Sequence, residues 1–361
     1  MKSWKSLIVA GSLVGCSSNV IDAGTNDAGS KTAVGGEAVV VASRLQIAPS
    51  HMVSDGTWLY WVMPGDGASI SPGLFRMPVG GGAIVNLTGN RAVGPWLLAV
   101  DDVSVYFVVG QGPVEIMAAP KETDGGSFSV ARSLTTATSA WGGATVLGDK
   151  MFWTEVSPSY AVTDGDGGPD HTVTAYVAPL RGGPPAILAH FSQNLNPAYF
   201  PSVNIAVTTS TAFLGSPSSN GLESFPIAAG YFPADGGMTQ LIQFGFLRMA
   251  PGCQIMLSDT NAVYCDTGTK IVSVASDGTL VVLGDVVGPT GVGSVAGGTV
   301  AYDDTHVYWT NAIAPGTIMR APKTGGPAVV LARDAEPLAI AADSKAVYWS
   351  DAAGNIMRLD K

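Results

Sequence analysis

The chain has 361 residues, of which 13% are charged, and its formal net charge is −10. Average soluble domains carry roughly 25% charged residues. This composition, with 46 glycines, therefore favours a β-rich protein with many tight turns over a helical one. The negative charge argues against nucleic acid as a partner, because neutralising phosphates requires clustered Lys and Arg side chains. After the N-terminal residues, no apolar run reaches the ~20 residues that a membrane-spanning helix needs.

The N-terminus predicts an export signal. Lys2 and Lys5 precede an apolar stretch, residues 7–14, that is too short to span a bilayer. The stretch ends in the letters LVGC, which resemble the lipobox of bacterial lipoproteins. In that family the signal is cleaved before the cysteine, whose thiol then carries lipid. We therefore expect residues 1–15 to be a signal peptide and Cys16 to be lipid-modified, with palmitate among its acyl chains; the alternative is an ordinary secretory signal with a chance cysteine.

Residues 16–36 lack hydrophobic periodicity and are rich in Gly, Ala, Ser, Asn and Asp. Such a composition predicts a flexible tether between the lipid and the folded domain. Ser17 stands where an Asp would, in enterobacteria, retain a lipoprotein at the inner membrane. The resemblance to lipoproteins thus implies a cell-envelope location, anchored in the outer membrane, with the domain facing the periplasm or the cell surface.

The rest of the chain is built from repeats. An aromatic pair, or a close variant of it, recurs at intervals of about 45 residues, the length of one propeller unit. The seven copies are Tyr60-Trp61, Tyr106-Phe107, Phe152-Trp153, Phe213-Leu214, Tyr264-Cys265, Tyr308-Trp309 and Tyr348-Trp349. In five copies an Asp that we expect to form a turn lies five positions earlier, namely Asp55, Asp101, Asp259, Asp303 and Asp343.

The last copies show the four strands of one unit, which we letter A to D. Strand A is residues 337–342, strand B is 346–350 and strand C is 355–359, while strand D of the preceding unit is 328–332. Tight turns join A to B and, through Gly-Gly, C to D. Seven such four-stranded units over residues 37–361 predict an all-β, seven-bladed β-propeller.

The ring is expected to close through the N-terminal end of the propeller. The letters GGEAVVVAS from Gly35 resemble GGPAVVLAR from Gly325, although the two lie far apart in the chain. The last unit stops after strand C, so we expect residues 37–43 to supply its missing strand D beside residues 355–359. Closure of this kind leaves no open gap between the first and last blades. The alternative is a chance likeness of two Val-rich strands.

The repeats carry a family resemblance. The letters YWTN from Tyr308, YWSD from Tyr348 and FWTE from Phe152 resemble the YWTD repeat of low-density-lipoprotein-receptor-type propellers. Those propellers have six blades, whereas this sequence has seven units, and its fourth and fifth units lack the Trp. Together with the lipobox and the tether, the repeats resemble uncharacterised propeller lipoproteins of myxobacteria. That resemblance implies a fold and a location but no activity.

Loop lengths predict where a function lies. The A–B turns are short, whereas the B–C and D–A connections are long, for example residues 63–72, 155–173 and 190–202. Binding residues gather on irregular loops held by a rigid scaffold. We therefore expect a non-catalytic binding or scaffolding protein of the cell envelope, whose loop-rich face takes a protein or a glycan. The alternative for the long loops is neutral insertion in solvent.

The second functional hypothesis is an extracytoplasmic metal-dependent hydrolase or lyase with a site in the central channel. The expected inner strands are mostly Ala, Val, Leu and Ile, which offers little catalytic chemistry. The histidines, none of which forms an H-x-H or H-E-x-x-H pair, are His51, His171, His190 and His306. We expect His306 to be a turn residue, and the strand-C arginines to be hydrogen-bond donors between blades: Arg76, Arg320 and Arg358.

One loop of the third unit is a candidate calcium site. Asp164, Asp166 and Asp170 follow D-x-D-G-x-x-D spacing, and calcium favours several carboxylate oxygens in a glycine-rich turn. Val162 stands where the longer motif has its first Asp, so the ligand set is incomplete. A solvated loop is the alternative.

Two cysteines flank the A–B turn of the fifth unit. If Cys265 lies opposite Ile255, then Cys253 is its diagonal neighbour on the same face of the sheet. Such a pair can approach disulfide distance, and an exported compartment is oxidising. We expect a disulfide between Cys253 and Cys265; two buried free thiols are the alternative.

Overall fold

The structure is a computed structural model that describes residues 37–43, 45, 47–63, 73–88, 93–109, 115–122, 128–132, 140–158, 171–193, 203–215, 221–227, 245–248, 253, 255–287, 299–313 and 315–361. All of them belong to the unit Val34–Lys361. The expected signal peptide, the lipidation site Cys16, the tether and the calcium candidates Asp164, Asp166 and Asp170 lie outside these residues. In the described ranges, no helix is long and apolar enough to cross a membrane.

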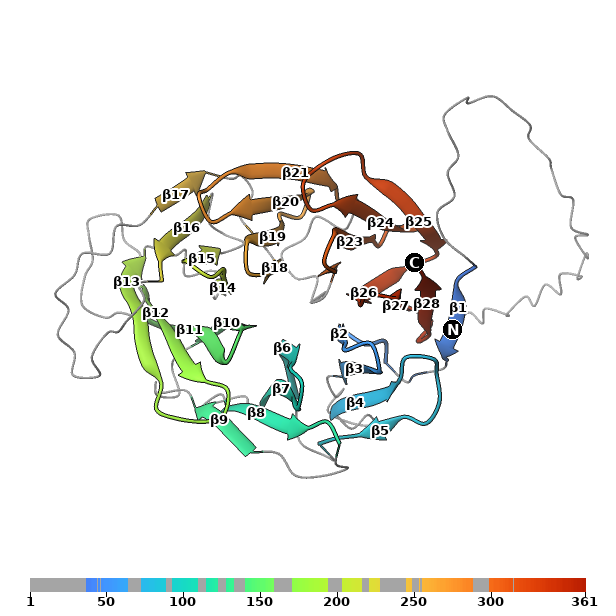
Figure 1. The fold of residues 1–361 in the computed structure, drawn as a ribbon, viewed down its shortest axis with the longest axis horizontal. Coiled ribbons are helices and arrows are strands. Elements are labelled where there is room, and N and C mark those ends of the chain that lie inside the picture. Colours follow the sequence, from blue (N-terminus) through green and yellow to red (C-terminus); the bar gives the residue numbers. More distant parts are fainter. Residues whose placement is uncertain are drawn as a thin grey trace, which may run out of the picture. The chain divides into compact units, whose positions relative to one another are not determined.

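Every element of the described residues is a β-strand, and the strands form seven antiparallel four-stranded sheets. Figure 1 shows the sheets arranged in a ring, with each A strand near the centre and each D strand at the rim. The prediction of an all-β, seven-bladed propeller is confirmed.

In blades 1 to 6 the four strands follow one another in sequence. Blade 1 is β2 (His51–Ser54), β3 (Trp58–Met63), β4 (Gly73–Pro78) and β5 (Val85–Asn86); blade 2 is β6 (Val93–Val100), β7 (Ser104–Val109), β8 (Glu115–Pro120) and β9 (Phe128–Arg132); blade 3 is β10 (Ala140–Leu147), β11 (Lys150–Pro158), β12 (His171–Pro179) and β13 (Ala186–Gln193); blade 4 is β14 (Asn204–Val207), β15 (Thr211–Gly215), β16 (Gly221–Pro226) and β17 (Gly245–Arg248). Blade 5 is β18 (Ile255–Ser258), β19 (Ala262–Asp266), β20 (Lys270–Ala275) and β21 (Leu280–Asp285); blade 6 is β22 (Val300–Tyr302), β23 (His306–Asn311), β24 (Gly316–Pro322) and β25 (Val329–Asp334); blade 7 is β26 (Pro337–Ala342), β27 (Ala346–Asp351), β28 (Ile356–Asp360) and β1 (Val39–Ala42).

Blade 7 combines strands from both ends of the described chain. Strand β1 pairs antiparallel with β28, with Val39 opposite Arg358 and Val40 opposite Met357. Beyond the strand, the Leu45 N–H donates to the carbonyl of Gly354 at 2.9 Å. The expected closure by the early Val-rich strand is therefore confirmed, and in Figure 1 β1 lies at the rim beside β28.

Where a repeat has two consecutive aromatic residues, their rings lie on opposite sides of the blade. Tyr308 packs with Val347 and Trp349 of blade 7, whereas Trp309 packs with Tyr264 of blade 5. This follows from the alternation of side chains along a strand. Full burial of a Phe-sized side chain contributes about 1.5–3 kcal/mol. The hydrophobic core therefore lies between neighbouring blades, and the repeated pair holds the ring together.

The Gly-Gly turns between strands C and D have two structural roles. Gly81 has φ 89°, a conformation that other residues rarely adopt. A Cβ atom on Gly81 would also lie 2.9 Å from the carbonyl oxygen of Val41 in the neighbouring blade. Glycine thus allows both the turn and its close packing on the outer strand β1.

Blade 3 has longer strands than the loop lengths predict. Strands β11 and β12 continue to Pro158 and His171, which pair with each other, and β13 continues to Gln193. The predicted loops 155–173 and 190–202 are therefore too long at their strand-proximal ends. The backbone pairing continues through Glu155, Val173 and His190, which sequence alone assigned to connections.

Candidate functional site

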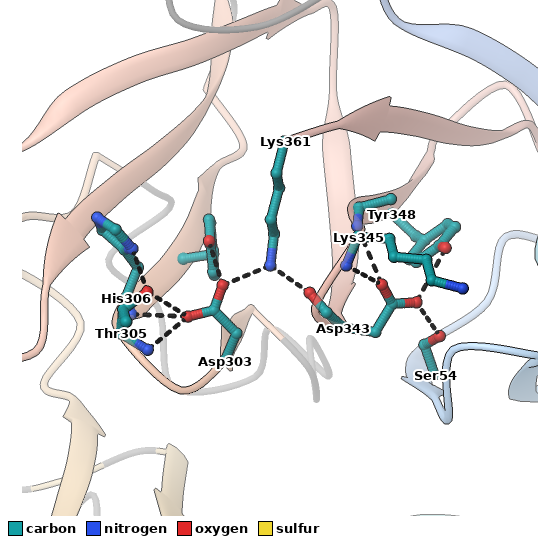
Figure 2. Close-up of polar contacts among 10 residues, drawn as sticks. Ser54, Asp303, Thr305, His306, Asp343, Lys345, Tyr348 and Lys361 are labelled. Carbon is teal, nitrogen blue, oxygen red and sulfur yellow. Dashed lines mark hydrogen bonds and ion pairs between the residues drawn. The ribbon is translucent and has the colours of Figure 1, made fainter.

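The A–B turns lie on one face of the ring and share a repeated polar motif. Figure 2 shows Asp303, whose Oδ1 accepts the N–H groups of Thr305 and His306 at 2.8 Å each. Its Oδ2 accepts the Tyr308 hydroxyl at 2.7 Å. The same contacts recur at Asp55, Asp101, Asp259 and Asp343. The prediction that these residues form turns is confirmed, and so is the turn role of His306.

Cationic side chains connect these carboxylates to the following blade. Lys361 Nζ lies 2.5 Å from Asp303 Oδ2 and also donates to the Asp343 carbonyl (Figure 2). The equivalent ion pairs are Lys121 with Asp55 and Lys323 with Asp259, each at 2.6 Å. In all three pairs the lysine directly follows strand C of one blade, and the aspartate lies in the A–B turn of the blade before it. We call this set of turn aspartates and their lysines the carboxylate belt.

The protonation states of the belt follow from these contacts. Burial alone would raise the pKa of the Asp303 carboxyl, but hydrogen bonds from Lys361, Tyr308 and the backbone hold that pKa well below its usual range. Burial and the adjacent carboxylate raise the pKa of the Tyr308 hydroxyl. The aspartates are therefore ionised at neutral pH, and their oxygens are engaged within the ring.

On the opposite, loop-rich face, hydroxyl groups connect the blades. Ser350 Oγ donates to the carbonyl of Pro49 at 3.0 Å and accepts the Ala339 N–H at 3.1 Å. The second bond is possible because the register of β26 against β27 shifts between Pro337 and Ile340. Equivalent donors are Thr154 to the Val203 carbonyl and Thr310 to the Leu338 carbonyl.

The indole N–H of the repeated Trp forms a second connection on this face. Trp309 Nε1 donates to the Asp285 carbonyl at 3.1 Å, at the end of the preceding blade's D strand. Trp349 Nε1 donates to Asp334 Oδ2 at 2.7 Å in the same way. In blade 3, Trp153 Nε1 donates to Glu155 Oε1 at 3.1 Å.

In blade 5 a cysteine takes the position of that Trp. Cys265 is joined to Cys253 by a disulfide, with their Cα atoms 5.5 Å apart. The expected register is wrong by one residue, because Cys265 pairs with Met256 rather than Ile255. The turn is tighter than expected, since Asp259 Oδ1 binds the N–H groups of both Asn261 and Ala262. Cys253 precedes β18, so strand alternation does not fix its direction.

Blade 1 departs from the repeat. Trp61 Nε1 is buried and has no hydrogen-bond partner in the described part of the chain, and Val62 replaces the bridging hydroxyl. Ser50 Oγ and His51 Nδ1 are likewise buried and unpartnered. Burial lowers the pKa of His51 to about 4, so its imidazole is neutral at neutral pH. We call Ser50, His51 and Trp61 the blade-1 corner.

The blade-1 corner is not among the sites that the sequence predicts, although one departure from the repeat marks it. The letters YWVM from Tyr60 replace the YWTN and YWSD of other repeats, so two apolar residues follow the Trp. The sequence marks His51 only as one of the histidines that form no H-x-H or H-E-x-x-H pair, whereas the structure places it on β2, an inner strand.

The other expected polar residues are structural where the chain is described. Arg358 Nη1 donates to the Val79 carbonyl of blade 1 at 3.1 Å, and Arg76 donates to the Lys121 carbonyl of blade 2. These two arginines confirm the expected bonds between blades, while Arg320 makes no such bond within the residues described. Over those same residues, no three His, Cys, Asp or Glu side chains gather in a way that could hold a metal ion.

Comparison with known proteins supports the β-propeller fold but no particular function. No protein-family pattern and no curated protein sequence matches this chain. Its structure resembles a catalytically inactive virginiamycin B lyase from Staphylococcus aureus, with a TM-score of 0.54 and 13% identity over 90% of this chain and 99% of that one. It also resembles a puromycin-hydrolysing peptidase of Mycobacterium tuberculosis, with a TM-score of 0.55 and 11% identity over 86% of this chain.

The peptidase is the longer protein, because only 51% of its chain is covered. A chain of the mitotic checkpoint complex has a TM-score of 0.54 and 11% identity, with 95% of this chain and 99% of that one covered. At such low identity the shared feature is the β-propeller, which hosts unrelated functions.

Proposed function

We propose that this chain is a non-catalytic binding or scaffolding lipoprotein of the bacterial cell envelope. Lipid on Cys16 anchors it, in the outer membrane, and its loop-rich face takes a protein or glycan partner. The observation that carries the proposal is the difference between the two faces. The repeated carboxylates of the A–B face all bind groups within the ring. Of the long connections between strands, 64–72, 159–170, 194–203 and 286–299 belong to the other face, and the exception is 227–244, between β16 and β17 of blade 4.

Physical reasoning supports this assignment. A carboxylate that already accepts two backbone N–H groups, a tyrosine hydroxyl and, in several blades, a lysine has little capacity left for a ligand. Loops that leave a rigid ring can present side chains to a partner while losing less conformational freedom on binding than loops on a mobile scaffold.

Loop replacement tests the proposal. Residues 159–170 and 194–202 are exchanged for Gly-Ser segments of equal length, which leaves β11, β12 and β13 intact. We expect these variants to lose capture of the partner from envelope extracts. Matched controls on the other face, Asp304→Ala and Lys345→Ala, should capture as the wild type does. If the loop variants capture the same partner with unchanged affinity, the loop-rich face is not the binding site.

The anchor has its own test. Cys16→Ser should move the protein from the membrane fraction to the soluble fraction and abolish incorporation of labelled palmitate. Retention in the membrane fraction without label would contradict anchoring through this cysteine.

A further inference from the structure

Exposed valines gather on two strands of neighbouring blades at the rim of the ring. In β25 of blade 6, Val329 is 39% and Val330 is 45% exposed, and in β1 of blade 7, Val39 is 52% and Val40 is 55% exposed. Each strand is at the outer edge of its sheet, and Figure 1 shows both on the same side of the ring. We call these four valines the rim patch.

The rim patch is a fixed part of the ring. Leu331 and Ala332 of β25 pack in one core cluster with Ala38, which precedes β1, and with Met357 of β28. The two strands are therefore held by the same core, so the valines on their outer sides keep their positions relative to each other.

Other blades show that this position does not require valine. In the register of the blades, Val40 and Val330 take one position, opposite the methionine of strand C. The same position holds Asn86 in blade 1, opposite Phe75, and Ser129 in blade 2. The fold thus accepts polar residues here, whereas blades 6 and 7 both expose apolar ones. Adjacent exposed apolar side chains mark a surface that is covered by something else.

The patch lies where the propeller is joined to its proposed anchor. Strand β1 begins at Val39, and residues 16–36 separate the lipidation site Cys16 from the start of the propeller. A flexible chain of that length spans about 25 Å. The rim around β1 is therefore held within reach of the bilayer. Such tethering gives even a weak contact a high effective concentration of lipid.

The charges around the patch select an uncharged lipid surface. Strand β1 contains no charged residue, and in β25 the charges begin only at Arg333. Acidic lipids attract clusters of Lys and Arg, but the charged residues in and beside these strands carry both signs in equal number: Arg320, Arg333, Arg358, Glu37, Asp334 and Asp360. Burial of the aliphatic side chains is then the driving force, and salt does not screen it as it screens ionic contacts.

We propose that the rim patch rests on the surface of the bilayer that holds the lipid anchor, with its four valines among zwitterionic headgroups. The inference rests on the proposed anchor and goes beyond it, because it names the side on which the propeller lies. Contact through the rim leaves both faces of the ring, including the loop-rich face, open to a partner.

Fluorescence quenching by lipid tests the contact. Full-length lipidated protein carrying Val330→Cys is labelled with a polarity-sensitive dye and reconstituted in phosphatidylcholine vesicles with brominated acyl chains. The matched control is Ile187→Cys, which has the same register position in blade 3, is 43% exposed, and lies on the other side of the ring in Figure 1. We expect brominated lipid to quench the dye at residue 330 at least about threefold more than at residue 187, equally in low and high salt.

A second comparison separates the patch from the dye. With the dye at residue 330, replacing Val39 and Val40 by Ser should lower the quenching at least about threefold, because less apolar area is buried in the bilayer. Ile187→Ser, the matched substitution outside the patch, should leave the quenching unchanged. All these side chains are exposed, so the variants should keep the Tm of the wild type.

Several results would overturn the inference. These are equal quenching at residues 330 and 187, quenching that high salt abolishes, or unchanged quenching after Val39 and Val40 are replaced. A dye at residue 330 that is shielded from aqueous iodide in detergent, but is not quenched by brominated lipid, would show that a second copy of the chain covers the patch instead.

Failure of the anchor is seen separately. A protein that incorporates no labelled palmitate and does not float with the vesicles contradicts both the anchor and the rim contact. A protein that floats with the vesicles, but is not quenched at residue 330, contradicts the rim contact alone.

Discussion

His51 should make the protein lose stability as the pH falls from 7 to 5. Burial lowers the pKa of His51 to about 4, whereas an unfolded imidazole has a pKa of about 6.5. As the pH falls, the unfolded state therefore binds the proton before the folded state does. The contribution of the neutral His51 to the free energy of unfolding is fully present above pH ~6.5 and is lost between pH ~6.5 and ~4. At ~1.4 kcal/mol per pKa unit, the full loss is about 3 kcal/mol, of which about 2 kcal/mol is lost by pH 5.

The assay is urea unfolding at pH 7 and pH 5 for the wild type and for His51→Leu. The substitution fills the buried position with an apolar side chain and removes the titrating ring. The wild type should lose about 2 kcal/mol more than the variant between these two pH values. The belt aspartates, such as Asp303, have lowered pKa values and so titrate below this window in both proteins. His306→Asn, in an A–B turn, serves as the control. Equal pH dependence of the wild type and His51→Leu would falsify the reasoning.

Two further predictions concern the connections between strands and blades. Ser350→Ala should reduce the free energy of unfolding by about 2–4 kcal/mol, because it leaves a buried carbonyl and a buried N–H without partners. Ser350→Thr keeps the hydroxyl and should retain most of the wild-type stability. Urea unfolding measures both variants, and equal stability of the two would show that the hydroxyl bridge does not stabilise the ring. The bond between Cys253 and Cys265 should appear as a disulfide-linked pair in peptide mass spectrometry, and replacing both by Ser should cost about 3 kcal/mol, from the entropy of the short loop that the bond closes. Free thiols in protein purified from the cell envelope would contradict that expectation.

The sequence determined the architecture because the architecture is a repeat. The aromatic pair recurs at the spacing of one blade, and its two rings must face opposite sides of a strand. The D-type strand that follows Gly35 determined in the same way how the ring closes. This strand precedes the first blade and belongs to no complete unit there, while the last unit lacks a strand D, so the two pair. The turn role of Asp303 and its equivalents was also readable, because an Asp satisfies N–H groups only two and three residues away.

Only the tertiary structure decided which side chains meet between blades. Lys361 and Asp303 lie 58 residues apart, and no local pattern relates them. The partner of each repeated Trp also differs from blade to blade, being a backbone carbonyl for Trp309 and a carboxylate for Trp349. In blades 6 and 7 the acceptor lies at the end of the preceding blade, whose position is set by packing and not by the Trp itself. The unpartnered corner around His51 and Trp61 therefore became visible only when the seven blades were assembled, because a missing hydrogen bond is a property of the surroundings and not of the residue that lacks it.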